Sequence, residues 1–263
     1  MDEHLLPRAF GETFPIITRA EGVRLWDRDG RELIDGTSGA ISVASIGHGR
    51  REVADAVHAQ MLRMDYVHDN EFHNEPASEL ARRVTEFAGG DFSHAVFFSS
   101  GSEAIESAVK LARNHHVMTG AAARNVVIAR KRSFHGATLF ALGIGDVAAR
   151  KTVYGPYMPS QVAKIPAPYC YRCPLGLEEA TCGLACAEEL ERTILELGPE
   201  NVSAFVSEPV VGAAAPALTP PPGYYEVIRR ICDRGIVLDA VHAGRLAELG
   251  DRYGIPFPAT SPG

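Results

Sequence analysis

The chain has 263 residues, of which 46% are hydrophobic and 22% are charged, and its formal net charge is -7. A chain of this size can bury a core in one or two globular domains, and its acidic balance excludes the basic surface that nucleic-acid binding needs. No apolar run approaches the roughly 20 residues that span a bilayer, and the N-terminus lacks a signal-peptide apolar region, so we expect a cytoplasmic protein without membrane or nucleic-acid partners.

The first ninety residues predict short elements of both kinds. Residues 1–19 are interpreted as an arm, and residues 22–36 as two short strands joined by an Asp-Gly turn. Residues 37–49 are rich in Gly, Ser and small apolar residues, which is typical of a loop near a ligand or an interface. Apolar residues recur at helical spacing in 50–64 and in 75–88, so both segments are predicted to be amphipathic helices.

Residues 95–113 predict a buried strand, a small polar turn and a helix. The strand is assigned to the apolar run 95–98, the turn to 99–102, and the helix to the residues from Ser102 onward. The first amides of a helix lack partners and carry partial positive charge, and Gly101 lets the backbone approach an anion closely. This pattern is typical of a phosphate-binding turn, and a helix capped by Ser102 with no ligand fits this stretch equally well.

The rest of the chain alternates short apolar strands with amphipathic helices. Strands are predicted at 125–129, 204–206 and 236–238, and helices at 186–197 and 224–233. This alternation predicts an α/β fold with a mainly parallel sheet, in which ligands bind at the carboxyl ends of the strands. Four polar clusters follow strands: Ser99 to Ser102, Phe134-His135, Glu208 and Asp239.

Together these clusters suit a phosphorylated aromatic cofactor. The phosphate would bind at the helix start, and Phe134 or His135 can stack on a flat ring. A carboxylate such as Asp239 facing a pyridine nitrogen keeps it protonated, which makes the ring an electron sink, as in pyridoxal phosphate (PLP) chemistry. The alternatives are Phe134 as a core residue, His135 as a hydrogen-bonded histidine, Glu208 as an ion-pair partner and Asp239 as a turn cap.

Several segments resemble class III (fold type I) PLP-dependent aminotransferases. FFSSGSEAIESAVKLAR is similar to the phosphate-binding segment of that family, SFHGATLFAL to its ring-stacking segment, and DGTSGAISVASIGHG to the loop where substrates enter. SEPVVGAAA, PPGYY and IRRICDRGI resemble the approach to its ring-nitrogen aspartate. The resemblance runs from about Gly22 to Asp239, and the omega-amino-acid, 4-aminobutyrate and acetylornithine type is the most similar.

The resemblance implies the PLP-dependent transferase fold of type I, a mainly parallel sheet with helices on both faces, incomplete at the C-terminus. Residues 1–50 would form an N-terminal arm and a small-domain segment. Residues 51–263 would form part of the large cofactor-binding domain. The resemblance also implies that Ser100, Gly101 and Ser102 hold the phosphate.

The remaining site roles that the resemblance implies concern the cofactor ring. Phe134 would stack on it with His135 beside it, Glu208 would lie near its hydroxyl group, and Asp239 would pair with its nitrogen. The family transfers an amino group from an amine or an amino acid, including omega-amino acids, to a 2-oxo acid, and it works as a homodimer. Racemases and aminomutases share these motifs, so the reaction type stays open.

The chain departs from the family at the Schiff-base lysine. The resemblance implies a lysine a few tens of residues after Asp239, but no lysine follows Lys164. Ala240 stands where the family has Glu, and the likeness fades after Gly244. We therefore expect a truncated aminotransferase that is inactive as written. The alternatives are a non-catalytic fragment that binds cofactor or dimerises with a companion chain and, less favoured, a metal-binding module.

Four cysteines form a C-x2-C-x8-C-x3-C pattern within a Cys-rich insertion at about residues 165–190. Two closely spaced pairs are typical of a tetrahedral thiolate site for structural zinc, with an iron–sulfur cluster as a second candidate. The alternative is four small buried residues without metal. A fifth cysteine, Cys232, falls on a helix face and is predicted to be core. The candidate ligands are Cys170, Cys173, Cys182 and Cys186.

Overall fold

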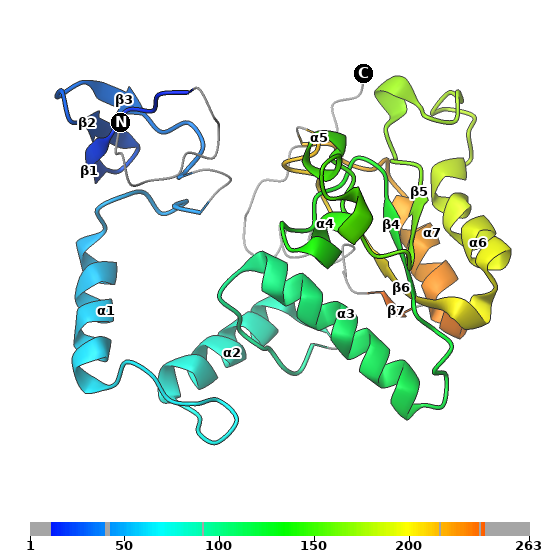
Figure 1. The fold of residues 1–263 in the computed structure, drawn as a ribbon, viewed down its shortest axis with the longest axis horizontal. Coiled ribbons are helices and arrows are strands. Elements are labelled where there is room, and N and C mark those ends of the chain that lie inside the picture. Colours follow the sequence, from blue (N-terminus) through cyan, green and yellow to red (C-terminus); the bar gives the residue numbers. More distant parts are fainter. Residues whose placement is uncertain (1–11, 40–42, 91, 216, 237, 240–263) are drawn as a thin grey trace. The chain divides into compact units, whose positions relative to one another are not determined.

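The computed structural model describes residues 12–39, 43–90, 92–215, 217–236 and 238–239 (Figure 1). The chain divides into two compact units, Met1–Glu75 and Pro76–Gly263, which are described separately. The domain boundary expected near residue 50 stays a prediction.

The first unit contains a three-stranded antiparallel sheet in the order β1-β2-β3. The Asp27 carboxylate stabilises the turn after β2 by accepting hydrogen bonds from the amides of Asp29 and Arg31, at 3.1 and 2.8 Å. The two strands and the turn predicted for 22–36 are confirmed, whereas β1 begins inside the segment predicted to be an arm. The strand bounds are Ile17–Glu21, Arg24–Asp27 and Glu32–Ile34.

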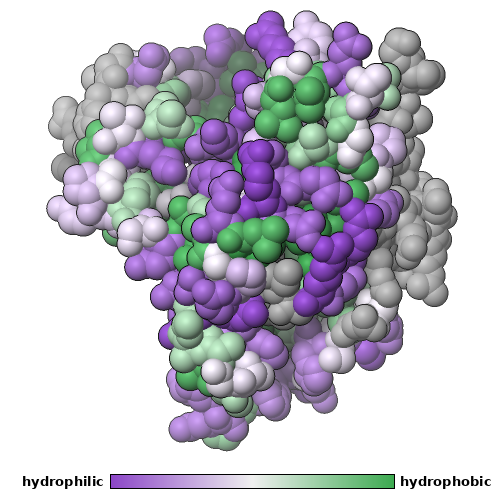
Figure 2. Space-filling model, turned by 90° about the vertical axis from the view of Figure 1, so that its right-hand side faces the viewer, coloured by the Kyte–Doolittle hydropathy of each residue, from purple (hydrophilic) through white to green (hydrophobic). Residues whose placement is uncertain are grey.

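The predicted helices 50–64 and 75–88 are present as α1 (Arg51–Arg63) and α2 (Glu75–Ala88). Neither helix buries any of its residues, so the apolar stripes that specify them stay exposed. On the face drawn in Figure 2, hydrophobic residues lie in small groups among hydrophilic ones. No helix within the described ranges combines the length and the hydrophobicity needed to cross a membrane.

The second unit is built on a four-stranded sheet in the order β5-β4-β6-β7, and every neighbouring pair is parallel (Figure 1). The predicted mainly parallel α/β sheet is therefore confirmed. The sequence did not predict β5, because its four residues, VAKI, are few and include a lysine. The bounds are Val126–Arg130 for β4, Val162–Ile165 for β5, Val202–Val206 for β6 and Leu238–Asp239 for β7.

Helices cover both faces of this sheet. Successive side chains of a strand point to opposite faces, so the apolar strand β4 contributes Ile128 to one core and Val127 and Ala129 to the other. The first core includes residues of α6 and α7, and the second includes residues of α3 and α4. The helix bounds are Gly101–Met118 for α3, Leu139–Ile144 for α4, Ala148–Lys151 for α5, Ala185–Leu197 for α6 and Tyr224–Ile231 for α7.

Short helical turns complete the unit. They are 3-10 turns at Gly155–Tyr157, Cys170–Arg172 and Pro199–Asn201, and a π-helical turn at Cys232–Ile236. The π turn follows α7 directly, so the helix predicted for 224–233 ends at Ile231 and changes its hydrogen-bond pattern there. Cys232 is buried in the core next to α7, as predicted.

The prediction of a buried strand at 95–98 is wrong for this structure. The segment has no regular secondary structure, Val96 is 73% exposed, and Phe97 and Phe98 are nearly half exposed. A strand needs a neighbour whose backbone completes its hydrogen bonds, and the four described strands of this unit pair only with one another. Apolar, strand-forming residues therefore do not make a strand here without a pairing partner.

Candidate functional site

The N-terminus of α3 leaves two backbone amides free. Ser100, and not Ser102 as predicted, is the N-cap, because its Oγ accepts a hydrogen bond from the Glu103 amide at 3.2 Å. The Ser100 carbonyl accepts from the Ala104 amide at 3.1 Å. Within the described part of the chain, the amides of Gly101 and Ser102 have no protein acceptor. These two N–H groups lie at the positive end of an 18-residue helix and can bind an anion.

The surroundings of Gly101 and Ser102 fit a phosphate group. A Cβ built on Gly101 would meet no atom of the described residues within 4 Å, so these residues leave the approach to its amide open. Ser102 Oγ accepts a hydrogen bond from the Ala137 amide at 3.0 Å, which leaves its own O–H to donate to an anion. A Cβ on Gly136 would lie 2.7 Å from Ser102 Oγ, so a glycine at 136 is what lets the segment after β4 approach this helix end.

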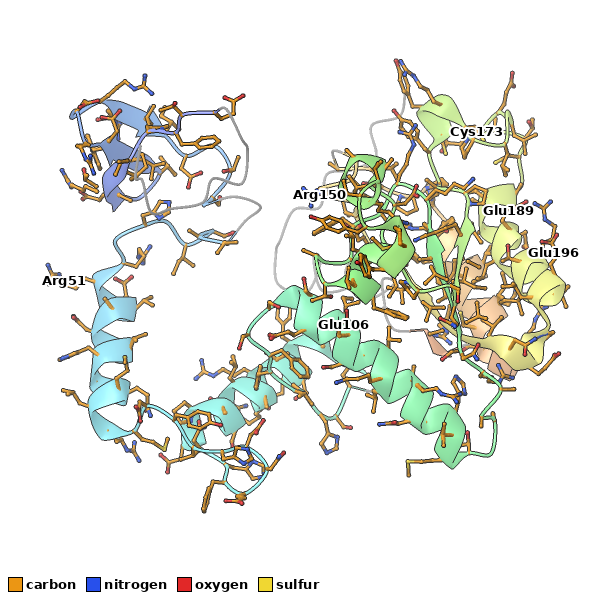
Figure 3. The ribbon with its side chains drawn as sticks, viewed as in Figure 1. Arg51, Glu106, Arg150, Cys173, Glu189 and Glu196 are labelled. Carbon is orange, nitrogen blue, oxygen red and sulfur yellow. The ribbon has the colours of Figure 1, made fainter. Side chains whose placement is uncertain are left out.

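Phe134 belongs to the segment after β4 that contacts the N-terminus of α3 through Ala137 and Ser102. Phe134 is half-buried, and the guanidinium carbon of Arg150 lies 4.8 Å from its ring centroid (Figure 3 labels Arg150). A cation over one face of an aromatic ring is attracted by its negative face. While Arg150 keeps this position, a flat cofactor ring can stack only on the opposite face of Phe134.

His135 is buried beside Phe134, and its Nε2 has no partner among the described residues. Burial, followed by the positive charges of Lys164 and Arg130, lowers the pKa of His135 to about 4. The ring is therefore neutral at neutral pH. A neutral ring can lie next to a cofactor without adding a cation to the site.

Glu208 connects the end of β6 to the Phe134 segment. Its Oε2 accepts a hydrogen bond from the Phe134 amide at 2.9 Å, and its Oε1 accepts one from the Gly212 amide at 3.3 Å. No ion pair of Glu208 is found within the described ranges, so the ion-pair alternative is not what the structure shows. The carboxylate lies next to the segment that the sequence predicted to face the cofactor ring.

Removing the Glu208 carboxylate should loosen this connection. Glu208→Ala leaves the half-buried Phe134 amide without an acceptor, and we expect it to lower the free energy of unfolding by about 2 kcal/mol. Glu208→Gln keeps one acceptor oxygen and should lose less than half of that. Glu196→Ala, at an exposed side chain of α6 (Figure 3), is the control and should change little. Denaturant titration measures all three, and equal losses for the two Glu208 variants would contradict the assignment.

Asp239 is placed by its backbone alone. It is the last residue of β7 and pairs with Phe205 of β6, so its backbone lies at the same carboxyl edge of the sheet as Glu208. Ala240 and Gly244, where the chain departs from the family pattern, lie outside the described residues.

Two hydrogen bonds connect Ser102, the Phe134 segment and Glu208, three of the places that the sequence predicted for the site. Ser102 contacts the segment after β4 through the Ala137 amide, and that segment contacts Glu208 through the Phe134 amide. The sequence missed Glu106 of α3 (labelled in Figure 3), whose Oε1 accepts from Thr138 Oγ1 at 2.5 Å and holds the start of α4. It also missed Arg130, although a charged residue at the end of an apolar strand was a signal that could have identified it.

The four predicted metal ligands line one enclosed space of about 10 Å³. All four are free thiols. Burial, followed by the charge of Glu179, raises the pKa of Cys170 to about 11, and burial, followed by Cys182, raises that of Cys186 to about 11. Among the residues the structure describes, however, no group of three or more His, Cys, Asp or Glu side chains could hold a metal ion. The structure therefore does not support the predicted zinc site, and it shows a cluster of four free thiols instead.

We expect the thiols of Cys170 and Cys186 to react slowly at neutral pH. The thiolate is the reactive form, so alkylation of Cys170 and Cys186 by iodoacetamide should accelerate as the pH approaches about 11. Mass spectrometry of peptides taken across a pH series measures the rate at each cysteine. A sample treated with a chelator serves as the control and should react at the same rate. Zinc in the purified protein, or faster alkylation after chelation, would contradict a metal-free cluster.

The chain matches the family model described as aminotransferase class-III over residues 6–254. An uncharacterized aminotransferase from Schizosaccharomyces pombe is 41% identical over 234 residues, which are 88% of this chain and 51% of the relative. A taurine–pyruvate aminotransferase from Bilophila wadsworthia is 34% identical over 242 residues, which are 91% of this chain and 52% of the relative.

Solved structures agree with this match. An (S)-enantioselective omega-transaminase from Thermomicrobium roseum has a TM-score of 0.85 and 33% identity, over 96% of this chain and 59% of its own. An amine transaminase from an uncultivated Pseudomonas species, in its PLP-bound form, has a TM-score of 0.83 and 26% identity, over 93% of this chain and 56% of its own. The chain spans about half the length of the curated relatives it matches.

Proposed function

Because the chain belongs to the class III aminotransferase family, we propose that it forms the cofactor-binding part of a PLP-dependent transaminase. The observation that carries this proposal is the N-terminus of α3, where two amides without an acceptor among the described residues lie next to a serine hydroxyl that contacts the Phe134 segment. PLP, when bound, supplies an electron sink for moving an amino group from an amine or amino acid to a 2-oxo acid. The transaminase names of the relatives support this reaction class.

In this proposal, different residues bind different parts of the cofactor. The amides of Gly101 and Ser102 and the Ser102 hydroxyl bind the phosphate, which suits the positive end of α3. Phe134 supports the ring through its open face. Glu208 holds the Phe134 segment in place, and Asp239 would pair with the ring nitrogen from the neighbouring strand end.

These 263 residues do not supply the lysine that the family reaction needs. The four lysines are Lys110, Lys131, Lys151 and Lys164, and none matches the family position. Lys164 is the most reactive candidate, because burial, followed by the charge of Lys151, lowers its pKa to about 7. An amine that is partly neutral near pH 7 can attack a carbonyl. We infer that PLP nonetheless binds this chain without a covalent bond.

The test has two measurements. Titration with PLP, followed by its visible absorbance, should show saturable binding that excess inorganic phosphate weakens. Borohydride treatment followed by intact-mass measurement should then leave the chain unmodified. Absence of saturable, phosphate-sensitive binding would overturn the proposed function. A stoichiometric adduct that Lys164→Met abolishes would instead show that the chain has its own covalent lysine.

A second candidate function is a non-catalytic subunit that pairs with another chain. It is favoured by large apolar residues of the second unit that stay exposed, namely Leu80, Val84, Phe87, Val96 and Phe97. The family resemblance predicts a homodimer, and a companion chain carrying the rest of the family length is the other possible occupant. Light scattering after size exclusion tests this: a monomeric mass, unchanged by PLP, would argue against pairing with a second copy.

A further inference from the structure

Arg130 is the last residue of β4 and is fully buried. Within the described ranges its guanidinium takes part in no ion pair, and its Nε has no hydrogen-bond partner. Removing a charge from water without an opposite charge nearby is costly, so such a residue is retained only where its remaining contacts compensate. The contacts of Arg130 therefore indicate what it does.

The guanidinium connects three elements at one point. Nη2 donates to the Glu208 carbonyl, just after β6, and Nη1 donates to the Tyr225 hydroxyl at 3.2 Å. The Tyr225 hydroxyl in turn donates to the same Glu208 carbonyl at 2.7 Å. The rings of Tyr224 and Tyr225, at the start of α7, lie 5.8 and 6.0 Å from the guanidinium carbon. Both aromatic faces and two oxygen acceptors thus offset the buried charge.

These contacts close a loop through the candidate site. Arg130 holds the backbone of Glu208, and the carboxylate of Glu208 holds the amide of Phe134, four residues after Arg130. The position of the Phe134 segment therefore depends on the Glu208 backbone being held by Arg130. An exposed glutamate with a free backbone would make the same hydrogen bond only part of the time, because its rotamers would compete.

We propose that Arg130 is a positioning residue for the cofactor site: through the Glu208 carbonyl and the Tyr225 hydroxyl it fixes the carboxylate that orients Phe134. This inference rests on the proposed function in one respect, namely that Phe134 faces a cofactor ring. The connection between Arg130, Glu208 and Phe134 exists without any ligand and can be measured without one.

The experiment uses Arg130→Met, Arg130→Lys and Tyr225→Phe in the full chain. Methionine keeps apolar volume without charge, lysine keeps the charge without the two-pronged geometry, and phenylalanine removes only the bridging hydroxyl. Arg192→Met, at an exposed arginine of α6, is the matched control. The measurements are hydrogen exchange at the Phe134 amide in the ligand-free chain, the free energy of unfolding, and the PLP dissociation constant.

We expect Phe134 exchange to accelerate about tenfold in Arg130→Met and Arg130→Lys and by a smaller factor in Tyr225→Phe, beyond any change in global stability. PLP affinity should fall in the same order, and Arg192→Met should match the wild type. Combining Arg130→Met with Glu208→Gln should add little to either change, because both act on one connection.

Two outcomes would overturn the inference. One is unchanged Phe134 exchange in Tyr225→Phe and in any Arg130 variant that folds. The other is exchange that rises only in proportion to the loss of global stability, which would make Arg130 an ordinary core residue. If the wild type fails to bind PLP, the proposed function fails, yet the exchange measurements on the ligand-free chain still decide the role of Arg130.

Discussion

Gly136→Ala is expected to lower the free energy of unfolding by about 4 kcal/mol. Gly136 has a φ of +142°, a region that is open almost only to glycine. The new Cβ would also lie 2.9 Å from the Cβ of Ala141 and 3.0 Å from the Cα of Ser102. Neither neighbour is the flexible end of a long side chain, so the segment after β4 must move away from α3. Denaturant titration of the variant measures the loss.

The same change should also weaken PLP binding, because it separates the two halves of the proposed site. Gly101→Ala is the matched control for stability. Its Cβ would meet no atom within 4 Å in the part of the chain that the structure describes, so the free energy of unfolding should change by less than about 1 kcal/mol. Its methyl group would nevertheless occupy the space where the phosphate is proposed to bind, so PLP affinity should fall. A Gly136→Ala protein as stable as Gly101→Ala would show that the segment is not packed against Ser102.

The second large expected effect is that the folded chain loses stability in acid because His135 gains a proton more readily when the chain is unfolded. Burial holds the pKa of His135 at about 4, against an ordinary value of 6.5. Between these values the unfolded chain binds a proton that the folded chain does not, so the free energy of unfolding falls as the pH drops through this interval. The His135 contribution is absent above 6.5, where both states are neutral, and reaches about 3 kcal/mol of destabilisation near pH 4.

His135→Gln isolates this effect, because glutamine keeps polar atoms in the pocket and does not titrate. Above pH 6.5 we expect the free energies of unfolding of the variant and the wild type to change with pH in the same way. Below pH 6.5 the free energy of unfolding of the wild type should fall more steeply. Urea titrations across the interval measure the difference. If the free energies of unfolding of the two proteins fell equally steeply below pH 6.5, the imidazole would gain a proton in the folded state as readily as in the unfolded one.

The sequence predicted the positions of most elements for local reasons. Helical spacing identified α1, α2, α3, α6 and most of α7, and short apolar runs identified β4 and β6. The errors of the sequence-based prediction occurred where pairing with a residue far away in the chain decides whether a segment forms a strand. Residues 95–98 have strand-forming composition but no described neighbour to pair with, and β5 is a strand because it pairs with β4 despite its weak local signal.

In the candidate site, too, local features were predictable and contacts between distant residues were not. The Ser-Gly turn and the Ser-Phe-His-Gly segment were recognisable because turn and helix-start chemistry depends on adjacent residues. The choice of Ser100 over Ser102 as the cap was not, because Ser102 Oγ is held by an amide 35 residues away. The regular cysteine spacing predicted a metal site, but spacing along the chain does not fix how the thiols converge in space.

By itself, the sequence determined the family, through the motifs that it shares with that family. It also determined the parallel α/β architecture, because the periodicity that marks helices and strands acts over a few residues. Only the tertiary structure decided that the Glu208 carboxylate accepts from the Phe134 amide, 74 residues away, and that the buried Arg130 donates to the Glu208 carbonyl. Contacts of this kind form only when separate strands are brought into one sheet. Their partners therefore depend on packing and not on local pattern.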